Sequence, residues 1–155
     1  MGSSPVTKLA QALDGVSQLG FDTAPIIYFV ERHPAFIAVV REVFRQVDVG
    51  AIAGMTGMVS LAEVLVKPKS LGDAALASAY RGLLFGSRNF SVLPINDDVA
   101  DQAADLRARY KMKLPDALQI ASALVSGCDA FLTNDSTDMK RVQEIRILVL
   151  KDLEP

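Results

Sequence analysis

The sequence is poor in the side chains on which several common chemistries depend. Its 155 residues include one cysteine, Cys128, one histidine, His33, and no tryptophan. A lone cysteine cannot form a disulfide within the chain, which favours a reduced, cytoplasmic setting. With one cysteine and one histidine, the chain cannot form a Cys/His zinc site or use a pair of histidines in catalysis. We expect Cys128 to be an inert buried thiol and His33, directly before Pro34, to be structural or solvent-facing.

Excess charge and long apolar runs are missing as well. Sixteen Lys and Arg against 18 Asp and Glu give a net charge of −2. That balance argues against a general nucleic-acid coat but leaves room for a local basic groove. The longest apolar stretches, such as residues 117–125, are interrupted by polar residues and too short to cross a bilayer. The sequence also lacks the pattern of a secretory leader and any glycine-rich phosphate loop of the Walker or dinucleotide kind.

What the sequence does have is the composition of one ordinary domain. Half of its residues are hydrophobic and 22% are charged, a balance typical of globular proteins. The length suits a single compact domain. We assign residues 17–155 to that domain and residues 1–16 to an N-terminal extension without a clear element. Residues 1–4, Met-Gly-Ser-Ser, look like a cloning remnant and are left out of the fold prediction.

Hydrophobic periodicity predicts strands that alternate with helices. The predicted strands cover residues 18–22, 51–59, 90–95, 129–133 and 145–150. The predicted helices cover residues 25–33, 35–47, 60–67, 72–86, 97–110 and 115–125, with a further short helical segment over residues 135–142. Such alternation is typical of α/β proteins, so we predict a three-layer α/β/α sandwich around a central, mostly parallel sheet.

Four acidic residues fall where this architecture brings distant segments together. Asp22 follows the first strand, and Asp135 follows the strand over residues 129–133. We place Glu63 in the first turn of the helix after the second strand, and Asp116 in the first turn of the helix that begins at Pro115. The carboxyl ends of the strands and the starts of the helices share one edge of such a sheet, where ligands usually bind. We therefore expect all four acids to meet there.

Each of these acids also has a structural explanation. Asp22 and Asp135 are common cap residues at strand-to-helix turns. Glu63 could complete a capping box with Ser60, and Asp116 could complement a helix dipole. Capping does not explain why the four residues should share one edge of the sheet.

Gathered carboxylates have an electrostatic consequence. They repel one another, which raises some of their pKa values. A hard divalent cation offsets that repulsion, and all-oxygen ligands suit Mg²⁺ or Mn²⁺. Such a cation lowers the pKa of bound water and stabilises charge on an attacked phosphodiester. Hydrolysis of phosphodiester bonds is therefore the chemistry that this pattern predicts.

Four segments, in this order, resemble the PIN-domain family, and in particular the VapC-type toxins of bacterial toxin–antitoxin pairs. They are Phe21-Asp22-Thr23 with the following Ile26-Ile27-Tyr28, then Ser60–Leu65, Leu114–Ala121 and Phe131–Asp135. The resemblance implies a PIN-like sandwich in which Asp22, Glu63, Asp116 and Asp135 form an acidic quartet that binds Mg²⁺ or Mn²⁺. It also implies auxiliary polar residues beside these acids, namely Thr23, Thr133, Asn134 and Asp138.

The family resemblance also sets the expected function. It implies an endoribonuclease that is the toxin of a type II toxin–antitoxin pair, with RNA as substrate, an antitoxin that covers the active site, and a homodimer. Lys140 and Arg141, just beyond Asp135, are the basic residues that we expect to contact RNA phosphates. Weaker candidates for the same role are Arg32, Lys67, Lys69, Arg107, Arg109, Lys111 and Lys113.

The predicted helix over residues 35–47 carries an apolar stripe. Its members are Phe36, Val39, Val40, Val43, Phe44 and Val47. Helix stripes of this kind normally face the core, which is the interpretation we favour. The alternative is part of a dimer interface or of a groove that accepts a helix from an antitoxin.

Two other functions fit parts of the pattern. A phosphatase of the haloacid-dehalogenase type or a receiver domain is also α/β with acidic residues at the sheet edge. However, Asp22 is followed by Thr23-Ala24, without the second aspartate that the first chemistry needs, and the paired acids and later lysine of a receiver are absent. A catalytically inactive PIN-like module that binds RNA or protein would keep the same acids as structural caps, and it is the main alternative to an enzyme.

Overall fold

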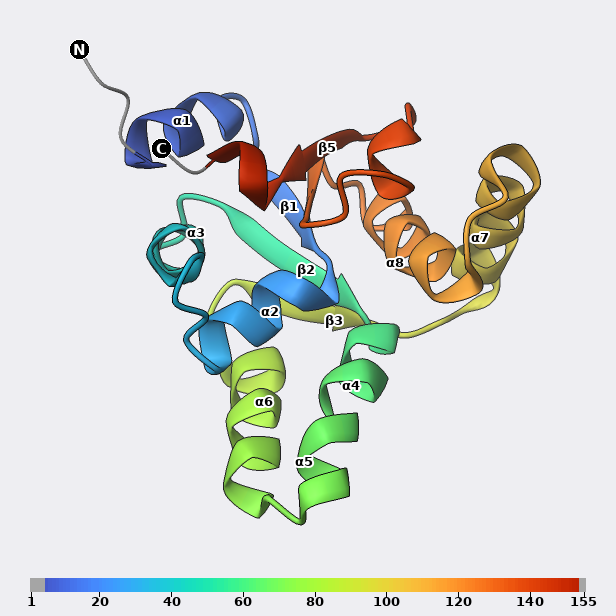
Figure 1. Ribbon diagram of the computed structural model, residues 1–155. Helices are drawn as coiled ribbons and strands as arrows, with labels where there is room; N and C mark the ends of the chain where they lie inside the picture. The colour runs from blue at the N-terminus through green and yellow to red at the C-terminus, as the bar shows by residue number, and fades with distance from the viewer. Residues whose placement is uncertain (1–4, 154–155) are drawn as a thin grey trace.

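The central sheet of the computed structural model, which describes residues 5–153, is entirely parallel. Its strands are β1 (Gln18–Phe21), β2 (Ala53–Gly57), β3 (Phe90–Leu93), β4 (Ala130–Thr133) and β5 (Arg146–Val149). They lie in the order β3-β2-β1-β4-β5, and every neighbouring pair is parallel (Figure 1). The predicted fold class is therefore confirmed, with a sheet that is parallel throughout.

Helices connect the strands and cover both faces of the sheet. They are α1 (Pro5–Ala12), α2 (Thr23–Val30), α3 (Ile37–Asp48), α4 (Met58–Val64), α5 (Val66–Leu71), α6 (Ala74–Gly86), α7 (Asp97–Tyr110) and α8 (Leu114–Val125), with short 3₁₀ turns η1 (Met139–Arg141) and η2 (Leu150–Leu153). Figure 1 shows α2 and α3 on one side of the sheet, α7 and α8 on the other, and α5 beside α6 in a hairpin that extends away from it. The molecule is thus the predicted three-layer sandwich with a helical hairpin added.

Alternation along the strands divides the core into two clusters. Leu19, Phe21 and Leu132 face the cluster under α2 and α3, whereas Met55 and Phe131 face the cluster under α7 and α8. This period of two is what strands with both faces covered require. Both faces of the sheet are therefore buried.

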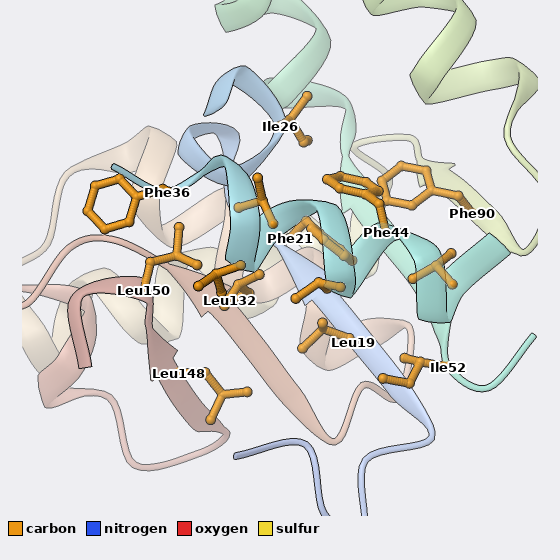
Figure 2. Close-up of a cluster of buried hydrophobic side chains, with 14 of the residues drawn as sticks. Leu19, Phe21, Ile26, Phe36, Phe44, Ile52, Phe90, Leu132, Leu148 and Leu150 are labelled. Carbon is orange, nitrogen blue, oxygen red and sulfur yellow. The ribbon is translucent and has the colours of Figure 1, made fainter. Parts of the chain in front are cut away.

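Aromatic side chains fill the centre of the first cluster (Figure 2). The Phe21 ring stacks on Phe44 with ring centroids 4.9 Å apart, and it meets Phe90 edge-on at 5.4 Å. All six members of the apolar stripe predicted for residues 35–47 are buried. The interpretation of this stripe as core is therefore confirmed.

Several predicted boundaries around β2 are wrong. The strand ends at Gly57, and α4 begins at Met58, so Ser60 is a buried residue inside the helix. Glu63 consequently lies in the last turn of α4 and not in its first turn, and no capping box with Ser60 forms. The N-cap is Gly57, which has no side chain to mark the start of the helix. The sequence signal for this boundary is therefore weak.

Two helix ends also differ from the prediction. Pro68 does not stop the helical segment after β2, because it is the third residue of the separate short helix α5, where its missing N–H is tolerated. This helix ends at Gly72, which adopts the left-handed conformation with φ 64°. Residues 135–142 contain only the three-residue turn η1 in place of the predicted helical segment.

The segment before β1, to which we assigned no element, contains α1. Leu9, Leu13 and Val16 from this segment are buried in the first core cluster. The Arg146 guanidinium on β5 donates to the backbone carbonyls of Asp14 at 3.1 Å, Gln11 at 3.4 Å and Ala12. These bonds satisfy carbonyls at the end of the helix and hold α1 against the sheet.

None of the helices in the described part of the chain is long and apolar enough to cross a membrane.

Candidate metal-binding active site

The strand order places one pocket at the carboxyl edge of the sheet. The chain enters the sheet at the central strand β1, moves outward to β2 and β3, and later returns to β4 on the other side of β1. Ligands bind at such a point, where the direction of the strand order reverses. Asp22, Glu63, Asp116 and Asp135 all line the pocket there, together with Tyr28 and Asn134 among others.

Asp22 is held at the centre of this pocket. It caps α2, with Oδ1 accepting from the backbone N–H of Thr23 at 2.8 Å, while Oδ2 accepts from the Thr133 hydroxyl at 2.7 Å. Burial raises the pKa of Asp22 to about 6, the charges of Asp116 and Glu63 add to the rise, and the two hydrogen bonds oppose it. Negative charge at Asp22 is therefore costly unless a cation balances it.

The negative charge of Asp116, like that of Asp22, is not balanced by the positive charge near it. It lies in the first turn of α8, as predicted, directly after Pro115. Burial raises its pKa, and the charges of Asp135 and Glu63 raise it further, against a smaller opposing effect of Lys113. The N-terminus of α8 does not compensate fully for the neighbouring carboxylates.

Glu63 reaches the pocket from the last turn of α4. Its Oε1 accepts a hydrogen bond of 2.6 Å from the Thr23 hydroxyl. Thr23, predicted as an auxiliary residue, therefore links the residue next to Asp22 with a second acid. The link fixes one oxygen of Glu63.

Asp135 is organised by its own loop. Burial disfavours its charge, but hydrogen bonds from Thr137 and from the backbone of Asp138 outweigh that effect and lower its pKa. Its Oδ1 accepts from the Thr137 backbone and hydroxyl, both at 2.9 Å, and from the Asp138 backbone at 3.1 Å. Asp135 therefore remains ionised beside its neighbours.

The other predicted auxiliary residues take separate positions. Asn134 donates to the Tyr28 hydroxyl at 3.2 Å and accepts from the Lys151 backbone at 3.2 Å. Thr133 is buried and bonds to Asp22. Asp138 is exposed, and its charge raises the pKa of Asp116. Asn134 thus supports the pocket wall, and Asp138 contributes only charge.

The donor set suits a hard divalent cation. All four acids offer oxygen ligands to one pocket. Two of them have raised pKa values, which a bound cation would lower. Within residues 5–153, no three Asp, Glu, His or Cys side chains are already grouped closely enough to hold an ion. Magnesium needs no such cage, because it binds through one or two carboxylates and retains several waters. Asp22 and Asp116 fit that requirement.

Cys128, which we expected to be buried, is only partly buried, and His33 has a structural role. Burial, and secondarily Asp129, raises the pKa of Cys128 to about 12, so the thiol stays protonated. The Nδ1 atom of His33 accepts from the backbone N–H of Ala35 at 3.0 Å, a local structural bond. Neither residue lines the acidic pocket.

The two basic residues predicted to contact RNA already have acidic partners. Lys140 lies 3.2 Å from Asp152, and Arg141 lies 3.7 Å from Asp138. Both pairs are exposed, so an incoming phosphate can compete for either cation.

The sequence analysis missed the polar side chains beneath the pocket. Gln119, Ser60 and Thr56 are buried and hydrogen-bonded to one another or to Thr23. The sequence signal that could have found them is Gln119, a polar residue on the side of the helix that faces the sheet.

These features define a class of protein: a parallel α/β sandwich with an acidic pocket, suited to a cation, at the carboxyl ends of its strands. The sequence profile of the PIN domain matches residues 21–145, which is most of the chain. The chain belongs to the PIN domain family.

Solved structures share this fold at low sequence identity. A chain of a toxin–antitoxin complex from Klebsiella pneumoniae is 22% identical with a TM-score of 0.65, covering 86% of this chain and 98% of that one. A chain of DNA-bound VapBC from Salmonella typhimurium is 20% identical with a TM-score of 0.68, covering 87% and 98%. A chain of VapBC2 from Rickettsia felis, bound to a promoter DNA fragment, is 15% identical with a TM-score of 0.66, covering 85% and 98%. Comparison with curated protein sequences gave no match.

Proposed function

We propose that this chain is a Mg²⁺- or Mn²⁺-dependent endoribonuclease and the toxin of a type II toxin–antitoxin pair acting in the cytoplasm. The observation that carries the proposal is the pocket in which Asp22, Glu63, Asp116 and Asp135 meet at the carboxyl edge of a PIN-family sheet. Two of these carboxyls have raised pKa values, which is the expected sign of a site that needs a cation.

The four acids would divide the work. Asp22 and Asp116 would bind the cation directly, because they are the two whose charge the protein compensates least. Glu63 and Asp135, each fixed by hydrogen bonds, would bind through water or orient the attacking water. When bound, the cation supplies an acidified water and neutralises charge on the phosphodiester. The bond broken would leave a 3′-oxygen on one RNA fragment.

The antitoxin that the family resemblance implies would cover the acidic pocket, and a groove away from that pocket offers it a second contact. This groove lies between α2, α3, α6 and β3, where the partly buried Phe29 and Leu83 border it and the core residues Phe44 and Phe90 lie beneath. Arg41, Arg45, Arg88 and Asp48 also line it, and Arg45 and Arg88 are already paired with Glu42 and Asp48. An apolar segment with an acidic residue near Arg41 would complement this lining. The structural neighbours come from toxin–antitoxin complexes, which supports an antitoxin as the partner. A homodimer, with RNA bound near Lys140 and Arg141, completes the proposal.

The test is a cleavage assay on total RNA with mapping of the cut sites. Wild-type protein should cut in Mg²⁺ or Mn²⁺, lose activity in chelator and regain it when the cation is restored. Asp116→Asn should lose at least about a hundredfold in rate, because a metal ligand is removed. Asp101→Asn, an exposed acid in the middle of α7, is the matched control and should cut normally.

Two results would contradict the proposal. One is full activity of purified Asp116→Asn, which would remove the acidic pocket from the chemistry. The other is tight RNA binding by wild-type protein without any product in either cation. That second result would establish the non-cleaving binding module.

A further inference from the structure

A network of buried polar side chains lies directly beneath the acidic pocket. Its members are Gln119 on α8, Thr23 on α2, Thr56 on β2 and Ser60 on α4, all at most 8% exposed. They come from four elements that meet under the carboxyl edge of the sheet. Buried polar groups are costly unless bonded. The network therefore calls for an explanation.

The direction of each hydrogen bond can be assigned from the acceptors at its ends. Thr56 donates its hydroxyl hydrogen to the carbonyl of Phe21 at 2.8 Å, because a carbonyl can only accept. The 2.6 Å contact between Ser60 and Thr56 must then be a donation from Ser60. Likewise, Thr23 donates to the Glu63 carboxylate at 2.6 Å. Each hydroxyl has then used its one hydrogen.

Gln119 must therefore present its amide nitrogen to this network. Its Nε2 lies 2.8 Å from the Thr23 hydroxyl oxygen and 2.7 Å from that of Ser60, and it has two hydrogens to give. The reverse orientation would point a carbonyl oxygen at two hydroxyls without free hydrogens. Nε2 also lies 3.5 Å from Glu63 Oε1, a much longer contact than its other two. The short bonds therefore form a directed chain from Gln119 through Thr23 to Glu63.

This orientation leaves Gln119 Oε1 buried without a hydrogen-bond partner. Leaving an acceptor unsatisfied costs stability. The other buried residues of α8 are apolar except Ser122, whose hydroxyl donates within the helix to the Leu118 carbonyl at 2.7 Å. Gln119 is thus the buried side chain of α8 that keeps an unsatisfied polar atom. A buried acceptor of this kind calls for an explanation, and a role for the two donations at the acidic pocket supplies one.

Glycine lets α8 approach closely enough for this contact. A Cβ atom at Gly57 would lie 2.6 Å from the Ser122 hydroxyl oxygen and 3.2 Å from Gln119 Oε1. Any larger residue would push α8 away from the end of β2. The close approach that brings Gln119 to Thr23 thus depends on both the end of β2, where Gly57 lies, and α8.

We propose that Gln119 is a positioning residue: it holds the Thr23 hydroxyl in the orientation that fixes the Glu63 carboxylate at the acidic pocket. The inference rests on the proposed metal-dependent activity and adds a residue to it. Without the Gln119 donor, the Thr23 hydroxyl keeps only the longer 3.3 Å contact with Ser60 beside its bond to Glu63. Glu63, which is exposed at the end of α4, is then held less firmly. A cation held partly by Glu63 then binds less tightly.

The test compares Gln119→Met with Thr23→Val, Thr23→Ser and the double variant Gln119→Met/Thr23→Val. Methionine keeps the length of glutamine and removes both the donors and the unsatisfied oxygen. Gln102→Met on α7, outside the network, is the matched control. Each protein is measured for Mn²⁺ affinity by electron paramagnetic resonance, for thermal midpoint, and for kcat and KM on an RNA oligonucleotide taken from a mapped cut site.

Removing groups that orient a metal ligand typically weakens metal binding by about 10- to 100-fold. We expect about a tenfold loss of Mn²⁺ affinity in Gln119→Met and Thr23→Val, and near wild-type affinity in Thr23→Ser and Gln102→Met. The kcat should fall with little change in KM. The thermal midpoint of Gln119→Met in chelator should stay within about 3 °C of wild type, because the missing donations are offset by removal of the unsatisfied oxygen. The double variant should be no worse than Thr23→Val, because Gln119 acts through Thr23.

Three outcomes would overturn the inference. Wild-type Mn²⁺ affinity in Gln119→Met would show that Gln119 positions nothing, while leaving the proposed nuclease intact. Additive losses in the double variant would show that Gln119 does not act through Thr23. Absence of both Mn²⁺ binding and RNA cleavage in the wild type would overturn the proposed function itself, and this inference with it.

Discussion

Asp22 has two roles that conflict in the absence of a cation. It caps α2 and anchors Thr133, yet burial and two neighbouring acids raise its pKa to about 6 from an ordinary 3.8. The folded protein therefore binds this proton more tightly than the unfolded chain does. Linkage then requires that the contribution of Asp22 to stability be greatest below about pH 4 and be lost as the pH rises through about 6.

Asp22→Asn should expose this conflict in metal-free protein. The variant keeps an N-cap side chain but cannot ionise. At pH 7.5 in chelator it should be more stable than wild type by about 2 kcal/mol, which is roughly 4–8 °C in thermal midpoint. At pH 4 that advantage should disappear. Thermal denaturation at both pH values checks this.

Asp101→Asn serves as the control for this comparison, since Asp101 is exposed on α7. Other acids, such as Asp135 and Asp129, have lowered pKa values and shape the pH dependence of the whole protein. Only the difference between variant and wild type isolates Asp22. An Asp22→Asn protein that is less stable than wild type by the same margin at both pH values would rule out the explanation.

Residue types at strand ends made the acidic pocket predictable from the sequence. Asp22 and Asp135 follow apolar strand segments, and Asp116 follows the helix-starting Pro115, so their place along the chain already fixed their edge of the sheet. Glu63 was predicted for the right pocket but the wrong turn of its helix, because Gly57 gives no capping signal. Gln119 was not predicted, because its role depends on Thr23, Ser60 and Glu63, which are remote in sequence.

At the scale of elements, the packing of α8 against β1 and β2 decides the geometry of the site. Glycines make that contact possible: a Cβ atom at Gly20 would lie 2.7 Å from the Cβ of Ala123, and one at Gly57 would lie 2.6 Å from the Ser122 hydroxyl oxygen. Both distances are shorter than real contacts allow. The helix that carries Asp116 and Gln119 therefore lies too close to the sheet to leave room for a Cβ atom at either glycine.

Gly57→Ala should consequently destabilise the protein. Overpacking of a tight contact costs about 1–3 kcal/mol, here because α8 or the end of β2 must move. Chemical denaturation should show that loss, and RNA cleavage should fall as Gln119 is displaced. Gly82→Ala is the control, since a Cβ there meets nothing within 4 Å and alanine favours the interior of α6. Equal stability of the two variants would contradict the close-packing explanation.

The N-terminal helix shows a different limit of prediction. Leu9 lies in α1, whereas the buried Leu13 and Val16 follow the end of the helix, so among the side chains that the structure describes only one buried hydrophobic residue marks the helix itself. The signal is short, and the helix is held by contacts to α3, η2 and Arg146 that no local pattern reveals. Tertiary contacts thus stabilise an element too short to be evident alone.

At the scale of the whole molecule, topology gathers charge that the sequence scatters. Asp22 and Asp135 are more than a hundred residues apart, yet β1 and β4 are neighbours and the register pairs Phe21 with Leu132. The net charge of −2 gives no bulk attraction for RNA. Any substrate must therefore be attracted by local cations around an acidic centre.

Affinity for RNA should accordingly depend on salt, with a slope that reports a small number of neutralised phosphates. In the inactive Asp116→Asn background, Lys140→Ala/Arg141→Ala should weaken RNA binding and reduce the slope of log affinity against log salt by about 0.7 for each phosphate that is no longer neutralised. Fluorescence anisotropy between about 50 and 200 mM KCl measures this range. An affinity that hardly changes with salt, or a slope unchanged in the double variant, would exclude these two residues from the RNA surface.

The proposed activity depends on a divalent cation bound by the acids of this pocket. Anomalous diffraction from crystals grown with Mn²⁺ tests it most directly. We expect a Mn²⁺ peak at about 2.1 Å from carboxylate oxygens of both Asp22 and Asp116, a ligand distance typical of such ions. A protein that cuts RNA in Mn²⁺ but whose only peak lies outside this pocket would contradict it.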